Sequence, residues 1–379
     1  MEYVALKDIC RINMGQSPES SSYNENGDGI PFFQGNADFG ERYPVTRVWC
    51  NAPTKVACAG DILISVRAPI GALNYAKEEC CIGRGLAAIT PDLSRVSTAF
   101  VYWFLKGKNT ELNSKGTGST FKAIGRKVLE ETLVPAIDFE TQNEYATNLE
   151  KVYSIIQMRK QELLKLDDLI KARFVEMFGD PVYNEKGWVT KSLDEICISI
   201  IDCPHSTPSY TSEDTGYMCI RTSIVKRNKI LWDEIEYIPE VEYKKRIKKK
   251  KPEKGDVIYT REGAILGIAA VIDRDCNVAL GQRSMLLSPD GNYCTPEFLS
   301  VAMNFESFLA SALKGMSGSA SPHINVGDIK AFKMILPPID KQEQFTAFIT
   351  QVDKSKVVVQ KALYEAQLLF DSLMQQYFG

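Results

Sequence analysis

Long hydrophobic runs, metal-ligand patterns and secretion signals are all missing from this sequence. No apolar stretch approaches the roughly 20 residues that a membrane-spanning helix requires. The ten cysteines include no Cys-x-x-Cys pair, and the two histidines, His205 and His323, do not have the spacing of a metal site. The chain begins without the basic and apolar signal region of a secreted protein. We therefore expect reduced thiols, no metal, no membrane and a cytoplasmic location.

Motifs that bind phosphate or activate a nucleophile are absent too. The sequence has no Gly-x-x-x-x-Gly-Lys-Ser/Thr phosphate loop, no Gly-x-Gly-x-x-Gly dinucleotide turn and no Gly-x-Ser-x-Gly elbow. Adjacent carboxylates such as Glu78 and Glu79 are more typical of solvated surface than of acid–base catalysis. These absences argue against an enzyme, although an enzyme with an unrecognised site stays open as an alternative.

What the sequence does contain is an internal duplication. Residues 6–10 match residues 193–197 at an offset of 187, and residues 60–63 match residues 255–258 at an offset of 195. The offset only grows along the chain, so small insertions in the second copy explain it. A tandem enzyme should repeat its catalytic residues, but the repeated positions are mainly glycines, hydroxyls and apolar residues. The pattern indicates two similar modules without a repeated active site.

Each copy consists of a mixed, strand-rich globule followed by a long helix. Proline marks both joins, at Pro135 and Pro337, because proline resists helix continuation. The stretches that begin at Glu140 and Asp340 contain neither proline nor glycine until Gly179 and Gly379, and glycine is a common helix stop signal. We therefore predict an α+β fold with two tandem mixed α/β domains. The predicted boundaries are 1–139 and 181–339 for the globules, and 140–180 and 340–379 for the helices.

Both predicted helices carry seam residues at alternating spacings of four and three, which is the pattern of a heptad repeat. At about 1.5 Å per residue, each helix would be roughly 60 Å long. A helix lying on a globular core is one interpretation. We favour pairing of the two helices, because both seams are narrow and the chain supplies two. The seam positions are Tyr145, Leu149, Val152, Ile156, Arg159, Leu163, Leu166, Ile170, Arg173 and Met177, and then Phe345, Ile349, Val352, Lys356, Val359, Leu363, Ala366, Phe370, Leu373 and Tyr377.

Net charge gives no direct sign of a nucleic-acid partner. The chain has a formal charge of −3, whereas residues 1–139 carry 15 basic and 15 acidic side chains and residues 181–339 carry 20 of each. A neutral globule can still present a basic face, and duplex DNA responds to that local field. The composition therefore permits DNA binding without predicting it.

Four features of the sequence combine into one recognisable order, which both copies share. The first is the globule–helix–globule–helix order over nearly the whole chain. The others are an opening segment at residues 202–210 with a counterpart at 15–18, a strand segment at 60–67 with a counterpart at 255–261, and a Gly-Ser loop before each proline join. No single motif is highly specific, but their repeated order is. In this order the chain resembles the specificity subunit of type I restriction-modification systems.

The resemblance implies a non-catalytic reader of double-stranded DNA. Each globule would be a target recognition domain for one half of a bipartite sequence. The helices would pair as an antiparallel coiled coil with pseudo-two-fold symmetry, fix the distance between the halves and dock two methyltransferase subunits. A restriction translocase subunit would join them, and S-adenosylmethionine would belong to the methyltransferase, so this chain would bind no cofactor. The alternative is a tandem coiled-coil scaffold that binds protein without DNA specificity.

Candidate DNA contacts fall into two kinds of segment. The Gly-Ser loops offer backbone N–H groups, hydroxyls and lysines to phosphate, and side chains near the repeated motifs offer hydrogen bonds to bases. The two copies differ at these places, as readers of different half-sequences should, although ordinary loops and sequence drift would look the same. The candidates are Gln34, Asn36, Arg84, Lys115, Thr117, Ser119 and Lys122 in the first copy, and Arg221, Thr222, Gln282, Arg283, Ser317, Ser319 and His323 in the second.

A basic run at residues 244–251 has no equivalent in the first copy. It precedes Pro252 and the repeated pair Gly255 and Asp256, which we interpret as a turn before a strand. A solvated helix is the interpretation that we favour for the run, and a phosphate contact is the alternative.

Overall fold

The computed structural model describes residues 2–118, 122–263, 265–314 and 323–379, and it divides into two compact units. Unit 1 contains Met1–Lys160 and Lys361–Gly379, and unit 2 contains Gln161–Gln360. Each unit therefore combines one globule with part of each long helix. Within the described residues, no helix combines the length and the apolar character that crossing a membrane requires.

Unit 1 is built on a four-stranded antiparallel sheet that is covered on both faces. All four residues of its β7 strand are buried. Ile62 and Ile64 belong to the main core, whereas Leu63 between them belongs to a smaller cluster, because successive side chains of a strand point to opposite faces. The strand order is β2 (Cys10–Met14), β10 (Leu86–Pro91), β7 (Ile62–Ser65) and β8 (Leu73–Tyr75).

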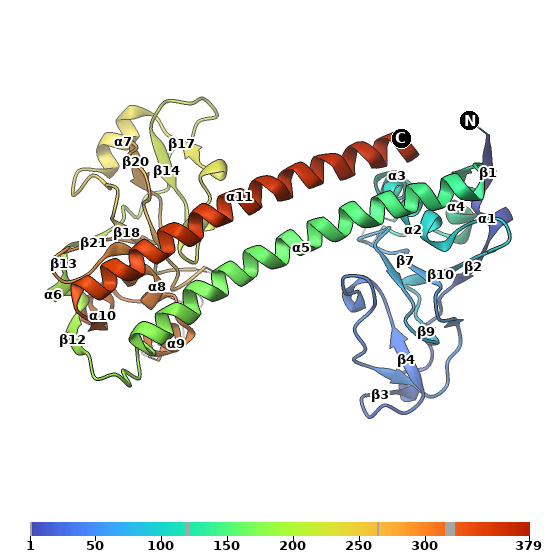
Figure 1. The fold of residues 1–379 in the computed structure, drawn as a ribbon, viewed down its shortest axis with the longest axis horizontal. Coiled ribbons are helices and arrows are strands. Elements are labelled where there is room, and N and C mark those ends of the chain that lie inside the picture. Colours follow the sequence, from blue (N-terminus) through green and yellow to red (C-terminus); the bar gives the residue numbers. More distant parts are fainter. Residues whose placement is uncertain (1, 119–121, 264, 315–322) are drawn as a thin grey trace. The chain divides into compact units, whose positions relative to one another are not determined.

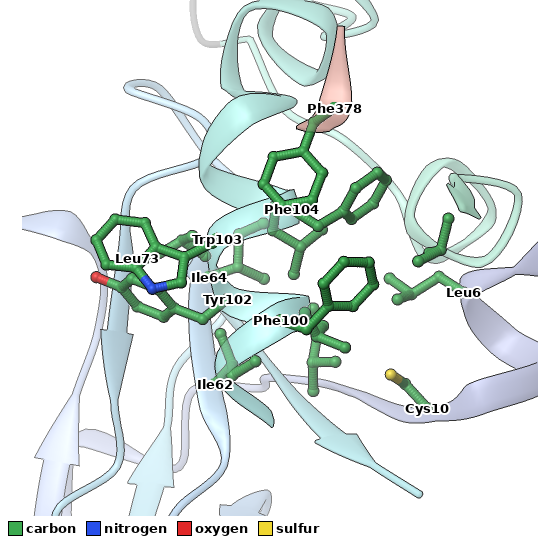
Figure 2. Close-up of a cluster of buried hydrophobic side chains, with 14 of the residues drawn as sticks. Leu6, Cys10, Ile62, Ile64, Leu73, Phe100, Tyr102, Trp103, Phe104 and Phe378 are labelled. Atoms are coloured by element: carbon green, nitrogen blue, oxygen red, sulfur yellow. The ribbon is translucent and has the colours of Figure 1, made fainter. Parts of the chain in front are cut away.

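Helices cover the main-core face of this sheet. Phe100 and Phe104 of α2 (Thr98–Gly107) are buried, and Figure 2 shows them beside Phe378 from the end of the chain. The Phe104 and Phe378 rings pack edge to face with centroids 5.8 Å apart. The other short elements on this side are α1 (Leu6–Ile9), α3 (Asn109–Ser114), α4 (Arg126–Glu130) and the paired strands β1 (Tyr3–Ala5) and β11 (Leu133–Pro135).

A second, five-stranded sheet forms the end of unit 1 that lies away from the long helix α5 (Figure 1). Its order is β3 (Tyr23–Asn24), β5 (Trp49–Cys50), β4 (Ile30–Phe33), β9 (Cys80–Ile82) and β6 (Val56–Ala57). The central pair, β4 and β9, is parallel, and the other pairs are antiparallel.

Unit 2 repeats this plan. Its four-stranded sheet has the order β13 (Cys197–Asp202), β21 (Ser284–Pro289), β18 (Val257–Thr260) and β19 (Ala269–Val271). A parallel pair again lies in a second sheet, ordered β17 (Glu236–Tyr237), β14 (Met218–Ile220) and β20 (Val278–Leu280). The remaining elements are β12 (Val189–Ser192) paired with β22 (Lys333–Leu336), β15 (Val225–Lys226) paired with β16 (Lys229–Ile230), α6 (Leu193–Ile196), α7 (Glu240–Arg246), α8 (Pro296–Met303), α9 (Glu306–Leu313) and α10 (Val326–Ala331). The predicted mixed α/β character of both copies is confirmed.

Each globular part is followed along the chain by a helix of 40 residues, α5 (Phe139–Phe178) and α11 (Ile339–Phe378). Gly179 follows α5 with a φ of 77°, the left-handed conformation that glycine adopts readily at a helix end. In unit 1, Tyr145 of α5 stacks on Tyr377 of α11 with ring centroids 3.8 Å apart. In unit 2, Phe178 of α5 meets Phe345 of α11 edge to face at 5.5 Å.

Candidate nucleic-acid interface

Four chain segments meet beyond the ends of strands in unit 1 and form what we call the first edge: residues 34–38, residues 66–69, residues 83–85, and the last segment, of which the structure describes residues 117–118 and 122–124. Backbone hydrogen bonds join them in series. Gly85 N donates to Gln34 O at 3.1 Å, Val66 N donates to Gly85 O at 2.9 Å, and Ile124 N donates to Val66 O at 2.9 Å. The first edge is therefore one continuous hydrogen-bonded layer that brings segments 90 residues apart in sequence side by side.

A cleft of about 490 Å³ opens in the first edge between Gln34, Asn36, Arg67 and Pro69. The Asp38 carboxylate shapes its wall by accepting the Gln34 N–H at 2.7 Å. The Gln34 side chain is exposed and that of Asn36 is half-buried, so both amides can reach an incoming ligand. The cleft thus combines a predicted pair of amides with an arginine, Arg67, that we did not single out from the sequence.

Glycine is required where these segments cross. A Cβ on Gly85 would lie 2.3 Å from Gln34 O, and one on Gly83 would lie 3.0 Å from the Gln34 Cα. Between these two glycines, Arg84 is exposed, and its backbone N–H donates to Ser17 Oγ at 3.3 Å. The close backbone approach places Arg84 next to the Gln34 segment.

The Gly-Ser loop supplies the remaining part of the first edge. Thr117 and Ala123 exchange backbone hydrogen bonds of 2.9 and 3.0 Å, and the carbonyl of exposed Lys122 accepts the Ala68 N–H at 3.0 Å. Lys115 instead points back to α3, where its ammonium pairs with Glu111 at 2.6 Å. Lys122 and Thr117 therefore lie in the first edge, whereas the charge of Lys115 is partly neutralised within its own helix end.

Three predicted contacts cannot be placed: Ser119, Ser317 and Ser319 lie outside the residues that the structure describes.

Unit 2 contains the same hydrogen-bonded layer, the second edge, formed by residues 220–222, 261–263, 281–283 and 323–324. Arg261 N donates to Arg283 O at 2.9 Å, and Ile324 N donates to Arg261 O at 2.9 Å. Gly281 N likewise donates to Ile220 O at 2.8 Å. The first two bonds match those from Val66 N to Gly85 O and from Ile124 N to Val66 O in the first edge. The third matches a bond of 2.8 Å from Gly83 N to Phe33 O. At the sequence offsets of the duplication, the repeat therefore extends to individual backbone contacts.

Arg221 and Thr222 stand where Gln34 and Gly35 stand in the first edge. The Arg221 guanidinium donates to the Glu236 carboxylate at 2.5 Å, and this hydrogen bond raises the pKa of Arg221. Its Cζ lies 5.6 Å from the centre of the Tyr210 ring. The exposed Arg221 side chain is thereby held between a carboxylate and an aromatic face.

Gln282 and Arg283 differ sharply in their availability. The Gln282 side-chain amide donates to the His205 carbonyl oxygen and so helps to hold the opening segment. Arg283 is exposed, with a φ of 65°, a conformation that is unusual for a residue with a β-carbon. Its guanidinium passes over Gly263, where an added Cβ would lie 3.2 Å from Nη1. Exposed His323 forms a backbone bridge with Glu262 at the same edge.

Two buried arginines support the second edge from inside. Arg261 is 6% exposed and forks onto the Asp202 carboxylate at 3.0 and 3.2 Å, while its Nη1 donates to the Ile324 carbonyl at 3.3 Å. It occupies the position of Val66 in the first copy. The sequence signal for this structural role was an arginine at a repeat position where the first copy has an apolar residue.

The second buried arginine, Arg246, belongs to the basic run at residues 244–251. Its Nη1 donates to the Leu280 carbonyl at 3.1 Å and its Nη2 to the Ser206 carbonyl at 2.5 Å. Helix α7 ends at Arg246, so only the first part of the run is helical. The predicted helix over the whole run is therefore wrong, because Lys248 and Lys249 lie in a bend beyond the end of the helix.

Within the described residues, no group of three or more His, Cys, Asp and Glu side chains is placed to hold a metal ion. The two edges offer amides, guanidinium groups, ammonium groups and backbone N–H groups, which are the groups that bind phosphates and base edges. Their chemistry suits a nucleic acid better than a small charged substrate.

The Type I restriction modification DNA specificity domain family matches residues 1–167 and 185–366 of this chain. A chain assigned as the specificity subunit of type I restriction enzyme MjaX, from Methanocaldococcus jannaschii, is 43% identical over 152 residues, which cover 40% of this chain and 36% of that relative. The type I restriction enzyme EcoBI specificity subunit of Escherichia coli is 19% identical over 99% of this chain and 85% of its own. The crystal structure of the type I restriction-modification system S subunit from M. genitalium has a similar fold, with a TM-score of 0.59 at 14% identity over 100% of this chain and 96% of that one.

Proposed function

Because this chain belongs to the type I restriction-modification DNA specificity family, we propose that it is the non-catalytic specificity subunit of such a complex. It reads a bipartite sequence in double-stranded DNA and docks the subunits that act on that DNA. Unit 1 reads one half of the target through the first edge, and unit 2 reads the other half through the second edge.

The observation that carries this proposal is one backbone frame that presents different side chains. Gln34 and Asn36 in the first edge offer amides, which suit adenine, whereas Arg221 and Arg283 in the second edge offer guanidinium groups, which suit guanine. Two of the three backbone bonds that join the first edge recur in the second edge, but the presented groups do not. Two readers of unrelated half-sequences require this combination.

The long helices support a spacer role. The start of α5 packs on the end of α11 in unit 1, through Tyr145 and Tyr377, and the end of α5 packs on the start of α11 in unit 2, through Phe178 and Phe345. Both contacts support helices that run in opposite directions. We therefore include in the proposal an antiparallel coiled coil with pseudo-two-fold symmetry that sets the distance between the half-sites.

The proposed partners are two methyltransferase subunits, which bind the S-adenosylmethionine, and a restriction translocase subunit. The outward side of α11 within unit 1 supports protein docking, because Tyr364, Leu368 and Leu369 are 62%, 51% and 51% exposed. This chain contributes no cofactor site in the proposed complex, which works in the cytoplasm where its DNA lies.

Mapping of methylated sites in cells that carry this chain and its methyltransferase tests the proposal. We expect one bipartite motif with a constant gap. Substituting Gln34 and Asn36 by alanine should relax the bases of one half and leave the other half and the gap unchanged. Methylation that ignores these substitutions in both halves, or an assembled complex without DNA specificity, would instead support a protein-binding scaffold.

A further inference from the structure

Three basic side chains crowd the turn of a short hairpin in unit 2. Strands β15 and β16 pair antiparallel and leave Arg227 and Asn228 as the two-residue turn. Lys226, Arg227 and Lys229 are all exposed. The hairpin follows the second edge directly along the chain, since only the short helix at Thr222–Ile224 separates it from Arg221. Its charges are therefore presented close to the groups proposed to read DNA.

The turn is fixed to the body of unit 2. Asn228 has a φ of 59°, which asparagine tolerates better than most residues. Its backbone N–H donates to the Ala269 carbonyl at 2.9 Å, and its side-chain oxygen accepts from Ser300 Oγ at 3.0 Å and from Asn304 Nδ2 at 2.6 Å. Three bonds to the sheet and to the end of α8 hold the hairpin in one orientation, so its charges need little ordering when a ligand binds.

The cations on this hairpin are not neutralised internally. Arg227 and Lys229 form no ion pair with any residue that the structure describes. Lys226 donates one of its ammonium hydrogens to a backbone carbonyl at 2.7 Å and keeps two others free for a ligand. Asp233 and Glu234 follow along the chain, and neither is paired with the hairpin in the described part of the chain.

The basic run at residues 244–251 is denser, but about half of its charge is engaged within the protein. Lys244 pairs with Glu240 at 2.7 Å, and Lys250 pairs with the buried Asp256 at 2.6 Å. Its single arginine is buried, as described above. Lys248, Lys249 and Lys251 stay exposed and form no ion pair with any residue that the structure describes. The hairpin differs from the run in that its three cations lie on a turn that is fixed to the body of unit 2.

We propose that the hairpin at residues 225–230 is a DNA-backbone contact, in which Lys226, Arg227 and Lys229 bind phosphates beside the half-site that unit 2 reads. This rests on the proposed function and adds a sequence-independent anchor to it. Fixed, exposed cations beside base-reading groups are the usual means of setting the register of a protein on a duplex. The equivalent turn of unit 1 has no such anchor, because Arg42 there points into the protein and pairs with Glu150.

The salt dependence of DNA binding tests this contact on the complex assembled with its methyltransferase subunits. The probes are a duplex that carries the mapped methylation site and an unrelated duplex of the same length. Each phosphate contact contributes about 0.9 to the slope of log K against log salt concentration. We expect K226A/R227A/K229A to lower the slope by about 2 to 3 on both duplexes, without changing which site is methylated.

The matched control removes three exposed lysines from the other run, in K244A/K245A/K248A, and should change the slope by less than about 1. Asn228→Ala should weaken binding at every salt concentration and leave the slope unchanged, because it loosens the hairpin without removing charge. Arg227→Gln alone, which largely keeps the size and polarity of the side chain, should lower the slope by about 1. This single variant tests the contact even if the triple variant does not fold.

An unchanged slope in a folded hairpin variant, while the wild-type complex binds its site, overturns the hairpin contact and leaves the proposed function standing. Absence of specific binding by the wild-type complex refutes both.

Discussion

At the residue scale, Arg42 shows how one side chain connects a reading segment to a long helix. It lies four residues beyond Asp38, in the loop that leaves the first edge. Its guanidinium pairs with Glu150 of α5 and has four aromatic rings around it, at 5.0 Å for Tyr102, 5.2 Å for Trp103, 5.3 Å for Tyr153 and 5.6 Å for Tyr75. The loop is thus attached to the helix through ring faces as well as through a carboxylate.

The aromatic rings should contribute more to this attachment than the carboxylate does. Glu150 is 48% exposed, so its ion pair is screened by water and is worth at most about 1 kcal/mol. The rings add up to about 2 kcal/mol for a desolvated cation. Arg42→Met should therefore destabilise unit 1 by about 2 kcal/mol, whereas Glu150→Gln should cost less than about 1 kcal/mol.

Hydrogen exchange of residues 36–45, with urea denaturation of the whole chain, measures both effects. Arg42→Lys is the informative control, because it keeps the charge but presents a more strongly hydrated ammonium to the rings. Equal losses from Arg42→Met and Glu150→Gln would show that the ion pair, and not the rings, holds the loop.

At the element scale, the crossing of the reading segments depends on glycine. Gly85→Ala places a Cβ 2.3 Å from Gln34 O, and the obstacle is backbone that cannot rotate away. We expect a destabilisation of about 1–3 kcal/mol, as for overpacked sites, together with loss of recognition of the half-site that unit 1 reads. Thermal unfolding and methylation mapping give the two readouts.

Gly125→Ala is the matched control for this prediction. An added Cβ there meets nothing within 4 Å, and the backbone φ of −90° suits any residue. Stability and site choice should both be retained. A Gly85→Ala chain that kept both properties would mean that the first edge can separate without affecting recognition.

The order and type of the helices and strands could be predicted from local sequence patterns. The side chains that hold the two edges in place could not. The mixed α/β character and the duplication were readable because turn glycines and apolar strands recur in order. Arg246 could not be recognised as internal from a run of basic residues, since its partners are backbone carbonyls at Ser206 and Leu280. Arg42 is equally invisible, because its rings come from three separate elements. Long-range polar contacts leave no periodic trace in a sequence.

At the scale of the whole molecule, the proposed spacer makes a prediction about the target. A heptad is the smallest insertion that keeps the seam of a coiled coil in phase. Seven residues lengthen a helix by about 10 Å at about 1.5 Å per residue. One base pair occupies about 3.4 Å along a duplex. Inserting one heptad at facing positions in α5 and α11 should therefore widen the gap between the methylated half-sites by about 3 base pairs and leave both half-sequences unchanged.

The control inserts the same seven residues into the exposed turn at residues 184–187, which follows α5 and carries no helix pairing. That chain should keep the original gap, because the seam is untouched. Methylation mapping reads both outcomes directly. A gap that stays constant when both helices grow would mean that something other than the helices fixes the distance, and the antiparallel spacer would have to be abandoned even if both edges still read their half-sites.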